Sequence, residues 1–194
     1  MYFSKCNAYL GGAIRIQNGD FVLENCLFEN NESDRLGGAI NTRGNNHYAY
    51  NCAFVSNRSN ATGGAIHNEG ATWHFYNSTF VGNEAATDGG GIHNSAIIDS
   101  LVNCLFYDNT AMSNSPDIFS SAANINVGIH NLLEDYSSSG LTLNQDNNIT
   151  GNPLLTNDYE LSDMNSPAVD SCTTYNNLPA TDLTSANNLS SINN

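Results

Sequence analysis

The sequence predicts an all-β protein of the right-handed parallel β-helix class, a solenoid built from coils of about 26 residues. The first observation is the motif Gly-Gly-Ala-Ile, which starts at positions 11, 37 and 63 and recurs as Gly-Gly-Gly-Ile at position 89. The second is the motif Asn-x-x-Phe, which starts at positions 25, 51, 77 and 103. The step between copies is constant and is the same for both motifs, without insertion or deletion. We therefore expect equivalent residues of successive coils to lie one above another.

A period of about 26 residues is also compatible with leucine-rich repeats. Those repeats need an LxxLxL strand and a helical or 3₁₀ segment, and the sequence has neither. Its segments are short, rich in β-branched and aromatic residues, and interrupted by Gly and Asn, which is typical of strands and turns. One coil has room for three short strands and three bends.

Four inward columns of side chains are predicted, because residues two apart on a strand face the same side. The columns contain Ile14, Ile40, Ile66, Ile92 and Ile118; Phe28, Phe54, Phe80 and Phe106; Leu23, Ala49, Phe75 and Leu101; and Cys26, Cys52, Ser78 and Cys104. The last column is compatible with buried free thiols and with a disulfide between Cys26 and Cys52. The cysteines include no CxxC pair, which argues against a zinc site.

Structural roles are predicted for the repeated Gly and Asn residues. The glycine pairs mark bends where the backbone turns tightly or approaches its neighbour, as at Gly37, Gly38, Gly63 and Gly64. An Asn follows three residues after each motif Phe. In a bend its backbone would adopt the left-handed conformation, which Asn tolerates, and its side chain would hydrogen-bond to the next coil. These residues are Asn31, Asn57, Asn83 and Asn109.

Together the two motifs resemble the GGAI and FxxN repeats of the polymorphic outer membrane protein family, over roughly residues 1–119. The sequence Ser-Pro-Asp-Ile at residues 115–118 is similar to the family's terminal variant, in which Pro-Asp-Ile replaces Gly-Ala-Ile. The resemblance implies the β-helical passenger region of an autotransporter-like surface adhesin. It therefore implies a secreted or cell-surface, extracellular location.

The C-terminal part resembles the closing segment of many bacterial right-handed β-helix proteins. The resemblance rests on Asn-Pro-Leu at residues 152–154, Tyr-Glu-Leu at 159–161 and Ser-Pro-Ala-Val-Asp at 166–170. We therefore expect β-helix coils over residues 1–150, a closing segment over 151–183 and a disordered tail over 184–194.

Composition limits the classes of partner. Lys and Arg number 5 against 19 Asp and Glu, which argues against nucleic acid and anionic membrane surfaces. No apolar stretch approaches the length of a membrane span, and the N-terminal residues lack the pattern of a signal peptide. The 33 asparagines fit a stacked fold, because identical amides in adjacent strands form hydrogen-bonded ladders.

The predicted function is a non-catalytic module for adhesion, glycan or partner binding, or extracellular assembly. The alternative is a polysaccharide lyase or hydrolase, which needs paired carboxylates and long loops that wall a groove. The constant coil length leaves no insertion to build such walls, and the few cations leave little to bind a uronate.

An outward strip of rings is the candidate ligand-binding site, at Tyr48, Tyr50, Trp73, His74 and Tyr76. Rings in an open row can stack on sugars or fill a protein interface. The competing interpretation is ordinary packing between neighbouring strands.

No cofactor is expected. His67 and His93 are one coil apart and are weak candidates for a metal or acid–base site. The acidic clusters at residues 32–34 and 146–148 are weak candidates for Ca²⁺, with solvated turns as the alternative.

The ends of the solenoid are expected to be open to pairing. Counting back by one period places Tyr2 in the column of Phe28, so that the chain starts in mid-coil. End-to-end self-association, which could form filaments, is therefore a further prediction.

Overall fold

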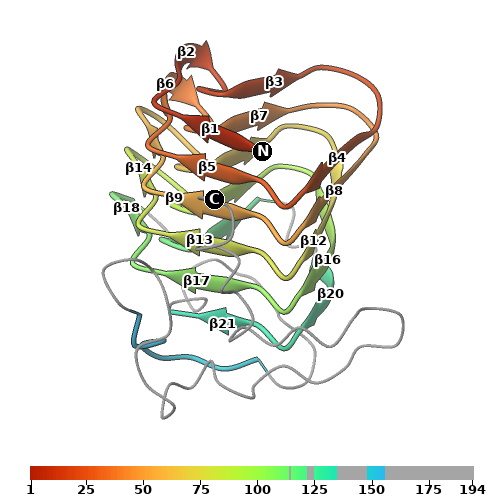
Figure 1. Cartoon of the computed structure of the whole chain (residues 1–194), viewed down its shortest axis with the longest axis vertical. Helices are drawn as coiled ribbons and strands as arrows, with labels where there is room; N and C mark the ends of the chain where they lie inside the picture. The colour runs from red at the N-terminus through yellow and green to blue at the C-terminus, as the bar shows by residue number, and fades with distance from the viewer. Residues whose placement is uncertain (114, 122–124, 135–147, 156–194) are drawn as a thin grey trace.

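The computed structural model describes residues 1–113, 115–121, 125–134 and 148–155, and the regular elements among these residues are all β-strands. The strands form four parallel sheets, and about five coils lie one above another (Figure 1). Along the chain, successive strands belong to sheets A, B, C and D in turn. The predicted parallel β-solenoid is confirmed.

The strands of the four sheets have the following bounds. Sheet A contains β1 (Tyr2–Ser4), β5 (Leu27–Glu29), β9 (Ala53–Val55), β13 (Thr79–Val81), β17 (Leu105–Tyr107) and β21 (Leu132–Leu133). Sheet B contains β2 (Asn7–Leu10), β6 (Glu32–Leu36), β10 (Arg58–Ser59), β14 (Glu84–Ala85) and β18 (Thr110–Ala111). Sheet C contains β3 (Ile14–Ile16), β7 (Ile40–Thr42), β11 (Ile66–Asn68), β15 (Ile92–Asn94) and β19 (Ile118–Ser120). Sheet D contains β4 (Phe21–Glu24), β8 (Asn46–Tyr50), β12 (Thr72–Tyr76), β16 (Ile97–Val102) and β20 (Ile125–Ile129).

Each coil therefore has four strands, where three were predicted. The additional strand belongs to sheet B and is very short in β10, β14 and β18. It lies between the ladder Asn and the glycine pair, in a segment too short and too polar for the sequence pattern to distinguish it from a bend.

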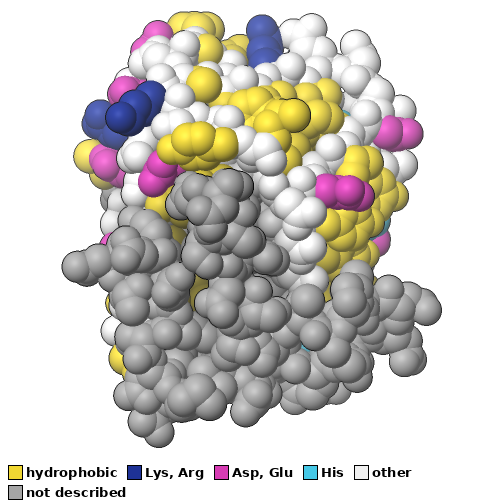
Figure 2. All heavy atoms as spheres, in the orientation of Figure 1, with side chains coloured by type: hydrophobic (Ala, Val, Ile, Leu, Met, Phe, Trp, Pro, Cys, Tyr) yellow, Lys and Arg dark blue, Asp and Glu magenta, His cyan; other side chains and the backbone are white. Residues whose placement is uncertain are grey.

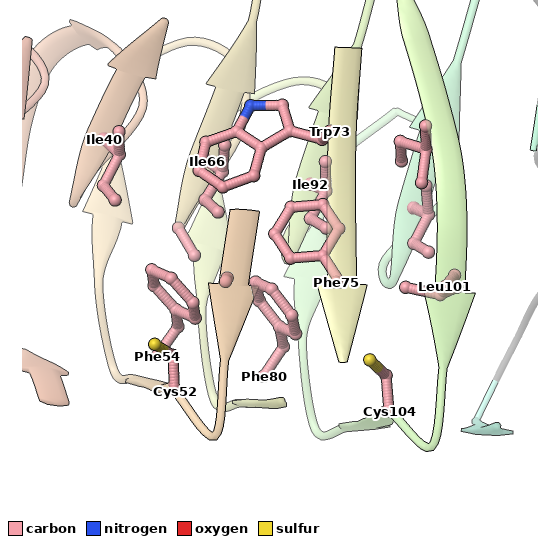
Figure 3. Packing of buried hydrophobic residues seen from close by; sticks show 14 of the residues in the cluster. Ile40, Cys52, Phe54, Ile66, Trp73, Phe75, Phe80, Ile92, Leu101 and Cys104 are labelled. Atoms are coloured by element: carbon pink, nitrogen blue, oxygen red, sulfur yellow. The ribbon is translucent and has the colours of Figure 1, made fainter. Parts of the chain in front are cut away.

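The register confirms that equivalent residues stack. Phe28 pairs with Phe54, and Phe54 with Phe80. The ring centroids of these two pairs are 5.0 and 4.6 Å apart, with planes within 7° of parallel. The isoleucine and Leu/Ala/Phe columns pair in the same way. Figure 3 shows these columns meeting inside the coil, where they form one continuous core.

The first coil does not follow the constant count. Phe3, not Tyr2, pairs with Phe28, and their rings stack with centroids 4.7 Å apart. The pairing of β2 with β6 shifts by one residue after Ala8, because β6 has one residue more than β2. The prediction that Tyr2 occupies the Phe28 column is therefore wrong, since the first step along this column is one residue shorter than the later ones.

The glycine pairs serve both predicted purposes. Gly37 has a φ of +66°, which L side chains rarely adopt. At Gly38 an added Cβ would lie 2.0 Å from the carbonyl oxygen of Gly64. Gly63 and Gly64 repeat this arrangement one coil later. The first glycine of each pair makes the turn, and the second lets adjacent coils approach.

The asparagines after the phenylalanines form a buried ladder. The Nδ2 atom of Asn57 donates to Asn83 Oδ1 at 3.0 Å and to the carbonyl of Phe28 at 3.0 Å. Asn31 donates to Asn57, and Asn83 donates to Asn109, in the same manner. The predicted bond to the next coil is confirmed.

The predicted left-handed backbone is wrong for the ladder residues themselves. The positive φ occurs one residue earlier, as at Asn30 and Ser56. That turn directs the following Asn into the core, where its amide replaces the hydrogen bonds that water would otherwise provide.

The ladder ends at the motif variant Pro-Asp-Ile. Asn109 donates to the carboxylate of Asp117 at 3.0 Å, and Asp117 is fully buried. Asp117 occupies the position of Ala39 and Ala65 in earlier coils. The variant therefore supplies an acceptor to the last ladder amide.

The outer face of sheet A is largely apolar and buried. Val55 and Val81 are each 2% exposed, and Ile149 and Leu155 pack against the cluster that contains Val81. Residues just beyond the coils thus cover part of this face. Residues 156–194, on which most of the predicted closing segment and the tail fall, lie outside the described residues.

Candidate functional site

Sheet D displays an array of four rings on its outer face. The alternation of β8 and β12 points His47, Ala49, Trp73 and Phe75 inward. It leaves Tyr48, Tyr50, His74 and Tyr76 on the outside, each partly buried. We call these four residues the aromatic array. Apolar side chains gather on the right of Figure 2, over the strands of sheet D in Figure 1, with an acidic side chain among them.

The rings of the aromatic array stack face to face between coils. Tyr48 and His74 have ring centroids 4.5 Å apart and planes within 7° of parallel. Tyr50 and Tyr76 are 5.2 Å apart at the same angle. Tyr48 and Tyr50, on one strand, lie 6.1 Å apart with planes within 5°. The stacked faces cover one another, so the array presents ring edges and phenol hydroxyls to the solvent.

Trp73 does not belong to this surface, and its assignment to the outward strip is wrong. It is fully buried, stacks on Phe75 with centroids 4.7 Å apart, and donates from Nε1 to Thr42 Oγ1 at 3.1 Å. Its neighbour across the sheet, His47, is also fully buried. The physical reason is strand alternation: if His74 faces outward, Trp73 must face inward.

A polar cluster borders the array at His74. Its Nδ1 lies 3.4 Å from Asp99 Oδ2 and 3.4 Å from Ser100 Oγ. Asn126 donates to the other carboxylate oxygen of Asp99 at 2.8 Å, which fixes the carboxylate. Burial lowers the pKa of His74 below its ordinary value, and the Asp99 carboxylate opposes that shift.

The place of Asp99 beside His74 could not be predicted from the sequence, because the constant coil length hides a local change. The loop after Asn94 is one residue shorter than the loop after Asn68, and β16 is one residue longer than β12. The pairing of these strands shifts between Trp73 and His74, so Asp99 has no partner in the register. The two changes cancel and leave the period unaltered, so only the pairing reveals them.

Electrostatically, the outer face of sheet D is acidic. Glu24 pairs in register with Tyr50, and Asp99 borders His74. The five strands of the sheet contain no Lys or Arg. All five Lys and Arg residues of the chain lie within residues 1–58, together with five acidic residues, and the other fourteen acidic residues follow them in the sequence. The negative charge therefore accumulates in the later coils.

His67 and His93 stack on the outer face of sheet C, with ring centroids 4.6 Å apart and planes 13° from parallel. They are 6% and 9% exposed. Nδ1 of His67 lies 2.7 Å from Thr62 Oγ1. Burial, reinforced by the neighbouring His93, lowers the pKa of His67 to about 4. Parallel rings direct their nitrogens along parallel lines, so they do not converge on one ion.

The described part of the chain offers few residues that could bind a metal ion. No group of three or more His, Cys, Asp or Glu there could hold a metal ion. In the first acidic cluster, Glu32 lies 3.5 Å from Arg58, an ion pair between adjacent coils. Of the second cluster, residues 146 and 147 lie outside the described residues.

Comparison with known proteins supports the assignment of the repeat. The model of the Chlamydia polymorphic membrane protein repeat matches residues 25–43 and 77–95. Each matched segment includes one strand of sheets A, B and C, together with the ladder Asn and the glycine pair. No curated protein and no solved structure matches the chain significantly.

These observations define the class of protein. The chain is a parallel β-solenoid with a stacked aromatic array on one sheet. It is a β-helix protein with repeats of the polymorphic membrane protein type. No helix among the described residues is long and apolar enough to cross a membrane.

Proposed function

We propose that this chain is a non-catalytic module of a cell-surface or secreted protein, and that the aromatic array binds a basic protein partner. The observation that supports binding is the array itself, four stacked rings held outward on a rigid sheet. Tyrosine supplies a large contact area at a low entropic cost and is enriched where partners dock. The matched repeat takes its name from membrane proteins of Chlamydia, which supports a location at the bacterial surface.

The orientation of the rings favours a protein partner over a glycan. A sugar packs its C–H groups against an open ring face, but Tyr48 and His74 cover one another, as do Tyr50 and Tyr76. Ring edges with hydroxyl tips offer apolar contact and hydrogen bonds together, which is the usual composition of a protein interface. Glycan binding is therefore the competing outcome of the test.

The charge around the array favours a partner rich in Arg and Lys. Glu24 and Asp99 border the array, and no Lys or Arg lies in the strands of sheet D. Complementary charge speeds encounter and suppresses like-charged partners. A second copy of the chain has a net charge of −14, so side-by-side self-association through this face would be opposed by repulsion. Adhesion to a basic surface is the form of binding that we propose.

The geometry near the array does not favour the enzymatic alternative. His74, Asp99 and Ser100 are adjacent, but both oxygen atoms face the same ring nitrogen, Nδ1. In a nucleophilic triad the carboxylate and the hydroxyl contact opposite nitrogens of the imidazole. A polysaccharide depolymerisation assay tests the alternative directly; activity abolished by His67→Ala or His93→Ala would replace the proposal.

The proposal is tested by measuring binding of the labelled chain to arrayed peptides of graded Arg and Lys content, with a glycan array in parallel. We expect binding to rise with peptide charge and to weaken at least tenfold, about 1.4 kcal/mol, in Tyr48→Ala and Tyr50→Ala. Tyr9→Ala is the matched control, because Tyr9 is a 59% exposed tyrosine on sheet B. Glycan binding without peptide binding, or equal losses in all three variants, would contradict the proposal.

A further inference from the structure

The cysteine column contains one adjacent pair of thiols. Cys26 and Cys52 occupy successive coils, whereas Ser78 separates Cys52 from Cys104. Cys6 lies in a different column, where its backbone N–H donates to Asn31 Oδ1. All four of these cysteines are reduced in the structure. Among the described cysteines, Cys26 and Cys52 are therefore the pair placed to react with each other.

The geometry of the pair suits a covalent bond. The coils are in direct contact at this point, because the N–H of Ala53 donates to the carbonyl of Cys26 at 2.9 Å. Adjacent parallel strands lie about 4.8 Å apart, within the range of about 4.4–6.8 Å between Cα atoms that a disulfide requires. Each Sγ now donates to a carbonyl oxygen two residues earlier, at 3.3 Å in both cases.

We propose that Cys26 and Cys52 are an oxidation site at which disulfide exchange links two adjacent coils. The thiolate of Cys26 attacks one sulfur of a small disulfide such as oxidised glutathione, and one glutathione thiolate leaves. Cys52 then loses its proton and attacks the Cys26 sulfur of the mixed disulfide, which releases the second glutathione thiolate. The protein loses two protons and two electrons, and one glutathione disulfide takes them up and is reduced to two thiols.

The different surroundings of the two thiols assign the order of attack. The neighbouring Cys52 side chain lowers the pKa of Cys26 to about 6, whereas the Cys26 side chain and burial raise the pKa of Cys52. The thiolate is the nucleophile in exchange, so Cys26 reacts first. Cys26 is also the more exposed of the two, at 5% against 2%.

The link would secure the coil that bears half of the aromatic array. The two Sγ atoms lie at the ends of β4 and β8, beside the carbonyls of Glu24 and Tyr50. The disulfide would close a loop of about 26 residues and so restrict the unfolded chain. The edge strands of the first coil would then separate less readily from β8, where Tyr48 and Tyr50 lie. This inference does not depend on the proposed function.

The experiment equilibrates the folded chain with mixtures of reduced and oxidised glutathione, quenches in acid, blocks free thiols and maps linked peptides by mass spectrometry. Cys172, which lies outside the described residues, is replaced by Ser in every sample. We expect a Cys26–Cys52 peptide and a higher thermal midpoint for the oxidised than for the reduced chain. The link should be lost in Cys26→Ser and Cys52→Ser but kept in Cys104→Ser, the control from the same column.

Ser78 occupies this column naturally, so serine is the substitution that it accepts best. If a variant does not fold, mapping of the chain with Cys26 and Cys52 intact still decides. The absence of a linked peptide in the most oxidising mixture would overturn the proposal. A link that involves Cys6 or Cys104, or a link between two chains, would overturn it as well.

Discussion

Acid should destabilise this β-helix through His67. The imidazole is 6% exposed and stacks on His93 with ring centroids 4.6 Å apart. Burial and the neighbouring imidazole both disfavour its protonated form. The pKa of His67 is about 4 in the folded chain, against an ordinary value of 6.5. Between these two values the unfolded state binds more protons than the folded state. The stabilisation is therefore complete above about pH 6.5 and is lost as the pH falls toward 4.

The size of the effect follows from the shift in pKa. Each pKa unit corresponds to about 1.4 kcal/mol, so protonation of His67 lowers the free energy of unfolding by about 3 kcal/mol in full. About 2 kcal/mol of it is lost between about pH 7.5 and about pH 5. His67→Asn removes the titrating group, and asparagine suits the site because Asn41 occupies the paired position one coil earlier.

The assay is urea unfolding of both proteins at the two pH values. Both free energies of unfolding should fall between about pH 7.5 and about pH 5. We expect the fall to be about 2 kcal/mol smaller for His67→Asn than for the unmodified chain. The other titrating groups are common to both proteins, so the difference between the two pH effects reports His67 together with its coupling to His93 and Glu69. An equal fall in both proteins would refute the argument that His67 is held neutral by its surroundings.

Three further substitutions test the packing. Asn57→Ala removes a ladder amide and leaves buried partners unsatisfied, so the free energy of unfolding in urea should fall by about 3 kcal/mol. Gly38→Ala places a Cβ 2.0 Å from a carbonyl oxygen and should prevent native folding as judged by circular dichroism, whereas Gly70→Ala, with nothing within 4 Å, should fold normally. Phe54→Ala opens a cavity in the middle of the stacked phenylalanines and should lower the unfolding free energy by about 3–5 kcal/mol; a loss below about 1 kcal/mol would mean that the ring is not packed as described.

The sequence predicted the parts of the fold that depend on exact repetition. Phe28 and Phe54, and the glycines at Gly37 and Gly38, recur because every coil needs the same buried volume and the same close approach. A constant spacing of such residues predicts both the stacking and the direction in which each side chain points.

The sequence did not predict the features at which the spacing changes locally. The one-residue shift after Ala8 moved Phe3 into the phenylalanine column, and counting alone cannot locate it. The lengthened β16 placed Asp99 beside His74 without altering the period. Trp73 was assigned to the outer face because it lies next to His74 in the sequence, whereas strict alternation from His74 places it inward.

The partly exposed array was predictable only in outline. Alternation identifies Tyr48 and Tyr50 as outward, but it does not say whether their faces are open. That depends on the residues opposite them, His74 and Tyr76, and on the rotamers that let all four rings lie parallel.

Phenylalanine side chains one coil apart lie in direct contact along a single internal column. Nuclear Overhauser effects between aromatic protons test it, in a sample with only phenylalanine protonated and with resonances assigned by single Phe→Leu variants. We expect contacts between Phe28 and Phe54, between Phe54 and Phe80, and between Phe80 and Phe106, whose centroids are 5.0, 4.6 and 4.6 Å apart. Contacts that skip a coil, or neighbouring rings with no contact at all, would contradict the stacked arrangement.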